Sequence, residues 1–137
     1  MALPPVFVRF LGNRALWEGR YVDPWSITHF ISGALVAYVF LFFGLDFWSG
    51  FGINFFIAVL WEFFEKYTRI SATEYASNNV TDVLFSALGF VAAYWVVHLP
   101  LKLSTRDTIF AILALVFVAV VIIGWISYTY YRGAGNA

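Results

Sequence analysis

Four ionisable side chains interrupt apolar stretches of this sequence and have the residue types to form one chemical site: His29, Glu62, Glu65 and Asp82. One imidazole with several carboxylates is a ligand set that suits a hard or borderline divalent cation such as Mg²⁺, Mn²⁺ or Zn²⁺. Such a cation can polarise the phosphate group of a lipid. We therefore take all four residues as candidate metal ligands, and His29, Glu62 and Asp82 as candidate catalytic residues. The sequence has no dense metal motif such as H-E-x-x-H.

The side chains of Asp23 and Asn79, together with that of Glu65, are expected to support the candidate catalytic residues. Ordinary helix chemistry offers an alternative for two of them. Asp23 followed by Pro24 is typical of an N-cap with proline at the first helical position. Asn79-Val-Thr-Asp82 has the form of a capping box, in which the positive start of a helix favours the aspartate.

The two glutamates and the histidine also have simpler alternatives. Glu62–Lys66 and Glu65–Arg69 have the spacing and orientation of surface ion pairs on a helix, and His29 could be a hydrogen-bonded packing residue. Glu62, however, follows the apolar run FFIAVLW near the end of its predicted helix, where the helix dipole opposes a negative charge. An acidic side chain costs about 2.5–3.5 kcal/mol at mid-membrane, so a cation, a proton or a hydrogen-bond donor must offset it.

The composition indicates a membrane protein. Of 137 residues, 62% are hydrophobic and 12% are charged, with a mean hydropathy of +0.81, whereas soluble domains carry about 25% charged residues. A formal net charge of zero gives no sign of a nucleic-acid partner. The absence of cysteine excludes disulfides, thiol catalysis and thiolate metal sites.

Hydropathy predicts an all-α, polytopic membrane protein with about four transmembrane helices, since each span needs about 20 mostly apolar residues. Residues 1–137 form a single membrane domain in this interpretation. It begins with a short N-terminal interfacial arm, residues 1–24, in which aromatic and apolar residues alternate with arginines. The predicted spans are residues 25–47, 51–67, 80–97 and 108–131.

The distribution of basic residues predicts the orientation in the membrane. Six Lys and Arg residues lie in the N-terminal arm, the loop after the second span and the C-terminal tail, against two, Lys102 and Arg106, in the loop after the third span. The positive-inside rule therefore places both termini in the cytoplasm. The candidate site residues on the first three spans then share one level at the cytoplasmic leaflet, because an up-down bundle brings alternate helix ends together.

Three elements of the sequence together resemble VanZ-like membrane proteins and their YjdF-like relatives. The elements are Asp23-Pro-Trp-Ser-Ile-Thr-His29, Trp61-Glu62-Phe-Phe-Glu65 and Asp82-Val-Leu-Phe-Ser-Ala-Leu-Gly89. Family members often have Lys after the first Asp and Asn four residues after the second, where this chain has Pro24 and Ser86. The resemblance implies an integral protein of the bacterial plasma membrane, the cell inner membrane. VanZ itself is associated with resistance to glycopeptides such as teicoplanin.

Three classes of function are compatible with these observations. The first, which the resemblance favours, is a VanZ-like protein whose polar site at the cytoplasmic leaflet binds or acts on a lipid head group or another envelope component. The second is a membrane-embedded, metal-dependent hydrolase or transferase. The third is a small accessory or scaffolding subunit of a larger membrane complex, in which abundant aromatic residues (16 Phe, 8 Tyr and 6 Trp) pack against partner subunits. The bilayer is the partner common to all three.

Overall fold

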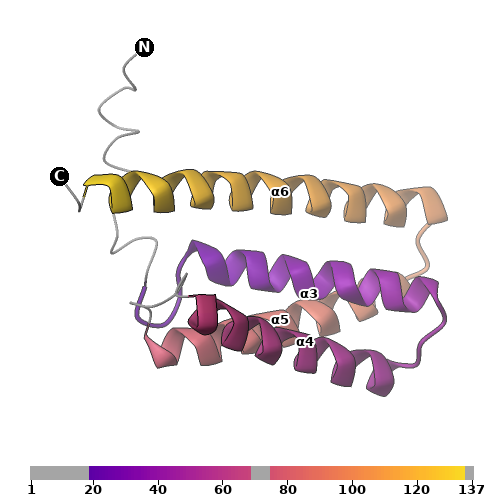
Figure 1. Ribbon diagram of the computed structural model, residues 1–137. Coiled ribbons are helices and arrows are strands. Elements are labelled where there is room, and N and C mark those ends of the chain that lie inside the picture. Colours follow the sequence, from indigo (N-terminus) through magenta and orange to yellow (C-terminus); the bar gives the residue numbers. More distant parts are fainter. Residues whose placement is uncertain (1–18, 69–74, 135–137) are drawn as a thin grey trace, which may run out of the picture.

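The computed structural model describes residues 19–68 and 75–134, and it is all-helical over these residues. The helices are α3 (Pro24–Phe42), α4 (Phe47–Thr68), α5 (Ala76–His98) and α6 (Leu103–Ala134), shown in Figure 1. All four are long and apolar enough to cross a membrane. The prediction of an all-α protein with four candidate membrane spans is therefore confirmed. Most of the predicted interfacial arm lies outside the described residues.

The turn between α3 and α4 lies earlier in the chain than the sequence suggested. Helix α3 ends at Phe42, five residues before the predicted bound, and Gly44 then takes a left-handed conformation (φ 76°) that suits a residue without a side chain. Helix α4 begins at Phe47 because Asp46 caps it: Oδ1 of Asp46 accepts hydrogen bonds from the backbone N–H groups of Trp48 (3.0 Å) and Ser49 (3.1 Å).

The start of α5 corrects the capping interpretation of Asn79 and Asp82. This helix begins at Ala76, four residues before the predicted bound, and its N-cap residue Tyr75 makes no side-chain cap. Asn79 and Asp82 therefore lie inside the helix, where both are buried. The capping-box alternative was wrong because α5 starts three residues before Asn79, and the carboxylate of Asp82 bonds to the side chains of Ser26 on α3 and Asn78 on α5.

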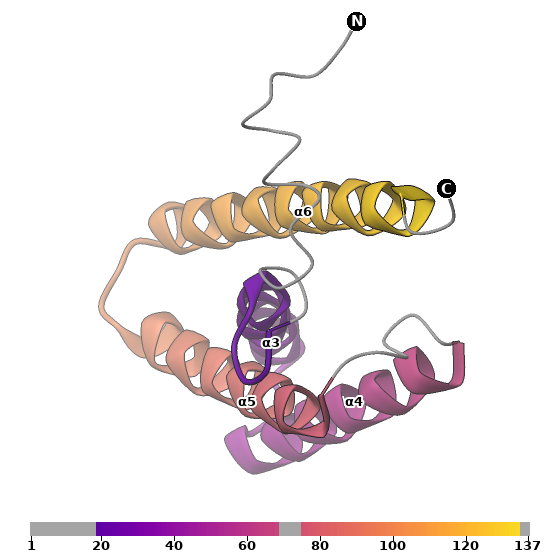
Figure 2. The same cartoon turned by 90° about the vertical axis from the view of Figure 1, so that its left-hand side faces the viewer.

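Helix α3 occupies the middle of the molecule. It lies between α6 on one side and the pair α4 and α5 on the other (Figures 1 and 2), and its main packing partner is α5. Consecutive helices run in opposite directions, so the start of α3, the end of α4, the start of α5 and the end of α6 lie at the same end of the bundle (Figure 1). We call this the site end.

Small residues allow α3 and α5 to approach closely, as small-xxx-small pairs commonly do in membrane helices. A Cβ atom added to Gly33 would collide with the backbone of Ser86, and one added to Gly89 would collide with the backbone of Phe30. Each glycine thus faces the main chain of the opposite helix. Both alanines one turn further along, Ala37 and Ala93, are buried in the same contact.

Polar and apolar residues are distributed as expected for a protein that has lipid as its solvent. Many large apolar side chains face outward, among them Phe42 (79% exposed), Leu115 (71%) and Trp95 (67%). The buried residues include a small apolar core around Phe90 and a larger set of polar side chains. Polar groups inside a membrane bundle mark functional sites by default, which directs attention to the site end.

Candidate metal centre

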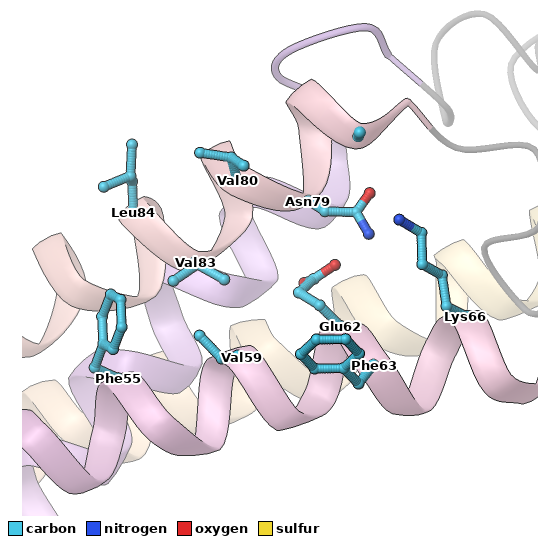
Figure 3. Close-up of a pocket in the computed structure, with 10 residues that line it drawn as sticks. Phe55, Val59, Glu62, Phe63, Lys66, Asn79, Val80, Val83 and Leu84 are labelled. Atoms are coloured by element: carbon cyan, nitrogen blue, oxygen red, sulfur yellow. The ribbon is translucent and has the colours of Figure 1, made fainter.

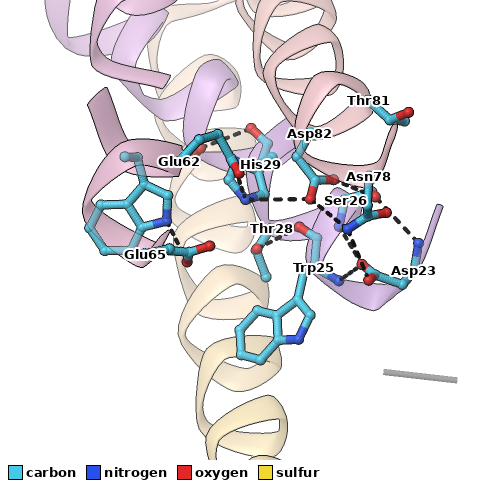
Figure 4. Close-up of polar contacts among 12 residues, drawn as sticks. Asp23, Trp25, Ser26, Thr28, His29, Glu62, Glu65, Asn78, Thr81 and Asp82 are labelled. Atoms are coloured by element: carbon cyan, nitrogen blue, oxygen red, sulfur yellow. Dashed lines mark hydrogen bonds and ion pairs between the residues drawn. The ribbon is translucent and has the colours of Figure 1, made fainter. Parts of the chain in front are cut away.

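Three of the predicted site residues meet between α3, α4 and α5. Nε2 of His29 lies 3.6 Å from Oε1 of Glu62 and 3.9 Å from Oδ2 of Asp82 (Figure 4). One ligand atom from each residue can be chosen so that all three lie within 4.8 Å of one another. His29 is 8% exposed, Glu62 7% and Asp82 1%. We call these three residues the buried triad.

Helix geometry explains why residues so far apart in sequence meet. His29 lies six residues after the N-cap Asp23, Glu62 six residues before the end of α4 at Thr68, and Asp82 six residues after the start of α5 at Ala76. At 1.5 Å per residue, each side chain leaves its helix about 9 Å from the site end. The predicted convergence of these residues at one level of the bundle is therefore confirmed.

The spacing of His29 from the two carboxylates of the buried triad is close to that of metal ligands. Two ligand atoms that are each about 2.1 Å from a tetrahedrally coordinated ion lie about 3.4 Å apart. The two separations from the imidazole nitrogen, 3.6 and 3.9 Å, would thus need to shorten by only a few tenths of an ångström. All three ligand atoms lie within 4.8 Å of one another, so one ion could be reached by all three residues after the side chains move closer together. Three protein ligands leave a fourth position for water or substrate, as in catalytic zinc sites.

Charge also favours a divalent cation at this place. If both carboxylates are ionised and the imidazole is neutral, the group carries two negative charges into a region of low dielectric, where charge is expensive. A divalent cation would make the group neutral. An imidazole nitrogen with two carboxylate oxygens is a donor set that suits Zn²⁺ and Mn²⁺, and the sequence contains no thiol that could compete for the ion.

Hydrogen bonds from two helices hold the carboxylate of Asp82 in place. Oδ1 accepts a hydrogen bond from Oγ of Ser26 (2.5 Å), and Oδ2 accepts one from Nδ2 of Asn78 (3.0 Å). The Ser26 hydroxyl also accepts a hydrogen bond from the backbone N–H of Asp23 (3.3 Å). Metal ligands in proteins are commonly oriented by such outer partners.

Asp23 connects this network to the start of α3, and its predicted role as an N-cap is confirmed. Its Oδ1 accepts hydrogen bonds from the backbone N–H groups of Trp25 (2.8 Å) and Ser26 (3.2 Å), with Pro24 at the first helical position. Its Oδ2 accepts a hydrogen bond from Nδ2 of Asn78 (3.2 Å). Burial raises the pKa of the Asp23 carboxyl, while these hydrogen bonds act in the opposite direction. Asp23 thus supports the triad through Ser26 and Asn78, without contributing a ligand.

Glu65 and Asn79, the other predicted supporting residues, lie beside the buried triad. Oε1 of Glu65 accepts a hydrogen bond from Nε1 of Trp61 (2.7 Å), and Glu65 is outside the group of three that could hold a metal ion. Asn79 is 8% exposed, and its Oδ1 has no hydrogen-bond partner among the residues that the structure describes. Glu65 as a metal ligand remains a prediction.

Comparison of the sequence and the structure with protein-family models, curated proteins and solved structures finds no match. The chain is thus described by its own geometry. It is a four-helix protein of membrane-like composition with a buried His/Glu/Asp cluster. The resemblance to VanZ-like proteins gains no support from these comparisons and remains a prediction.

Sequence reasoning missed two residues that matter to the site, Ser26 and Asn54. Ser26 stands three residues after Asp23, the capping-box position, and this signal could have indicated that its hydroxyl was fixed. Asn54 is 2% exposed on α4, and its Nδ2 donates hydrogen bonds to the carbonyl oxygen and to the hydroxyl of Ser86 (both 3.4 Å). An amide within the apolar run FGINFFIAVL was the available signal for this second polar contact.

Proposed function

We propose that this chain is an integral membrane protein that binds a divalent cation through His29, Glu62 and Asp82 and presents it to a lipid or another envelope component at one membrane face. The observation that carries the proposal is the position of the His29 imidazole, whose Nε2 lies 3.6 Å and 3.9 Å from two buried carboxylates on two other helices. A cation in this place would act as a Lewis acid toward a phosphate oxygen.

The architecture around the triad supports this proposal. The three ligands come from rigid helices, and Asp82 is fixed by two hydrogen bonds, so the group is organised before any ion arrives. The triad lies about 9 Å from the helix ends, near the level at which lipid head groups meet the hydrocarbon region. A cation held there can reach a head group that stays in its own leaflet.

The VanZ-like resemblance belongs to the same proposal. Each of the three sequence elements that carry it contributes one member of the buried triad: His29, Glu62 and Asp82. On this interpretation the protein resides in a bacterial plasma membrane, with both termini and the site at the cytoplasmic side. Whether the cation supports hydrolysis, group transfer or binding alone depends on the ligand that occupies its open position.

Metal analysis of the purified protein tests the proposal directly. We expect a stoichiometric amount of Zn²⁺ or Mn²⁺ after equilibration with the ion, and its loss in the Asp82→Asn and Glu62→Gln variants. Asp46→Asn is the matched control, because it also neutralises one carboxylate but lies in the turn before α4, far from the triad in sequence and at the opposite end of that helix. Equal metal content in all variants would refute the proposed centre.

A double-mutant cycle distinguishes a linked site from separate polar contacts. If His29 and Glu62 share a cation, His29→Ala and Glu62→Gln should each remove nearly all of the cation-dependent rise in melting temperature, and the double variant should lose little more. If they are independent hydrogen-bonding residues, each change should cost about 0.5–2 kcal/mol and the costs should add. Additive losses that do not depend on added cation would contradict the proposal.

A further inference from the structure

A pocket between α4 and α5 adjoins the buried triad. It encloses about 430 Å³, a volume within the range of small-molecule sites, and Glu62 of the triad is part of its lining. Figure 3 shows that Asn79 and Lys66 extend toward Glu62 at one end of the pocket. The remainder is lined mainly by apolar side chains, among them Phe55, Val59, Val83 and Leu84.

The lining changes from apolar to polar along the helix axes. On α4, Phe55 and Val59 precede Glu62 and Lys66. Phe55 and Lys66 are eleven positions apart, which corresponds to about 16 Å of helix. The apolar end points toward the middle of the bundle, and the polar end points toward the site end. A membrane lipid has the same order of chemistry, with a hydrocarbon chain in the bilayer core and a head group at the interface.

The exposed walls of the pocket indicate that its ligand comes from the bilayer. Phe63 (67% exposed), Val80 (62%) and Leu84 (54%) line the pocket and also face outward on helices that are apolar enough to be in contact with lipid. An amphiphile could therefore enter sideways from the leaflet without crossing water. A water-soluble substrate would instead meet an apolar wall along most of this pocket.

The polar end carries groups that recognise a phosphate-bearing head group. The Lys66 ammonium is a point charge of the kind that binds phosphate, and a cation on Glu62 would add positive charge beside it. Asn79 supplies an independent indication of a ligand. Its Oδ1 lies buried without a hydrogen-bond partner among the described residues, although a buried acceptor normally has one. A hydroxyl group next to the phosphate would supply the missing donor.

We infer that the α4–α5 pocket binds one acyl chain of a phosphate-bearing membrane lipid and places its phosphate between Lys66, Asn79 and the cation of the buried triad. This inference rests on the proposed function for the role of the cation, while the pocket, Lys66 and Asn79 stand on their own geometry. It identifies the substrate or ligand class of the site as an anionic lipid that enters from the leaflet.

Native mass spectrometry of the detergent-purified, full-length protein counts bound lipids and tests the inference. The probe is oleoyl-lysophosphatidic acid, which has one chain, one phosphate and one free hydroxyl. Monooleoylglycerol has the same chain without phosphate, and glycerol 3-phosphate has the head group without the chain. We expect binding of the first probe and weak or no binding of the other two. Equal binding of monooleoylglycerol would overturn the phosphate assignment, and binding of glycerol 3-phosphate alone would overturn the acyl-chain pocket.

A matched pair of variants locates the binding to the pocket. Leu84 (54% exposed) and Leu88 (58%) lie one turn apart on the outer side of α5, and only Leu84 lines the pocket. Leu84→Trp should lower the affinity for oleoyl-lysophosphatidic acid about tenfold, because it displaces the equivalent of about two methylene groups. Leu88→Trp should bind like the wild type. Equal affinity in the two variants would refute the pocket.

Lys66→Gln and metal analysis keep this inference distinct from the proposed function. Neither Leu84→Trp nor Lys66→Gln alters a residue of the buried triad, so both variants should retain the metal content of the wild type. Lys66→Gln should weaken binding of oleoyl-lysophosphatidic acid and leave that of monooleoylglycerol unchanged. Metal binding with no effect of either variant on lipid would refute the pocket alone. Pocket-dependent lipid binding in a protein that holds no metal would refute the proposed function alone.

Discussion

The hydroxyl of Ser26 lies 2.5 Å from Oδ1 of Asp82, and this hydrogen bond joins the first turn of α3 to α5 across 56 positions of sequence. The other oxygen of Asp82 lies 3.9 Å from the His29 imidazole. Both oxygens of the carboxylate are thus held by hydrogen bonds, Oδ1 by Ser26 and Oδ2 by Asn78, and Oδ2 is the one that faces His29. Because Ser26 also takes part in the capping box of α3, the start of this helix and the site share one hydrogen-bond network.

Removing the Ser26 hydroxyl should weaken cation binding without removing a ligand. Outer partners of metal ligands typically contribute about 10–100-fold in affinity, so we expect a loss of that size for Ser26→Ala in a competitive chelator titration. Ser32→Ala is the control, since Oγ of Ser32 bonds to the carbonyl oxygen of His29 within its own helix (2.8 Å). Unchanged affinity in Ser26→Ala would show that Asp82 is positioned by other contacts.

The close approach of α3 and α5 should depend on two glycines. Gly33→Ala and Gly89→Ala each place a methyl group against the backbone of the opposite helix, which cannot move aside as a flexible side chain would. Overpacking of this kind costs about 1–3 kcal/mol. Gly52→Ala on α4 is the control, because nothing lies within 4 Å of the added atom. Thermal unfolding in detergent should show both losses, with Gly52→Ala at or above wild-type stability.

Cysteine labelling can decide the orientation, because the native chain has no cysteine that would react. The exposed residues Ser49 and Tyr75 lie at opposite ends of the bundle, Ser49 near the start of α4 and Tyr75 before α5. The segments that the predicted topology places on the side of Tyr75 carry six of the eight basic residues, so Ser49→Cys should react with an impermeant reagent outside the cell and Tyr75→Cys only after permeabilisation. The reverse pattern would place the buried triad in the outer leaflet.

The sequence allowed the fold and the centre of the site to be predicted for one physical reason. Apolar spans leave few places for His29, Glu62 and Asp82, and the up-down order of four spans brings their helix ends together. The meeting of residues that are distant in sequence could be predicted from hydropathy, since lipid strongly restricts where polar side chains can lie.

The details that could not be predicted depend on local competition between equivalent polar groups. Asn79-Val-Thr-Asp82 satisfies the pattern of a capping box, and only the three-dimensional position of Ser26 and Asn78 shows that Asp82 bonds elsewhere. Helix bounds shifted for a similar reason. Asp46 fell inside the predicted first span, residues 25–47, yet it lies at the end of the turn before α4 and its side chain caps that helix.

Acidification should change the stability of the folded protein through Asp23, in the direction set by the burial of its carboxyl group. Desolvation raises the pKa of its carboxyl above the ordinary 3.8, despite the hydrogen bonds from Ser26, Gly19, Trp25 and Asn78 that act to lower it. The folded protein therefore takes up this proton at a higher pH than the unfolded chain does. Ionised Asp23 contributes a free-energy cost to folding that is fully present above the folded pKa and disappears as the pH falls toward 3.8.

The melting temperature of the wild type relative to Asp23→Asn should accordingly rise as the pH is lowered from neutral toward 3.8, because the asparagine can still cap α3 but does not titrate. Asp46→Asn provides the opposite sign. Hydrogen bonds from Ser49 lower the pKa of the Asp46 carboxyl, so the stability that it contributes is present above 3.8 and is lost as the pH falls through the folded pKa. Thermal scans should therefore extend below pH 3.8: the difference from Asp23→Asn should rise on the way down to that pH, and the difference from Asp46→Asn should fall beneath it. A wild-type advantage over Asp23→Asn that shrinks on acidification would mean that the hydrogen bonds at the start of α3 outweigh the burial of its cap.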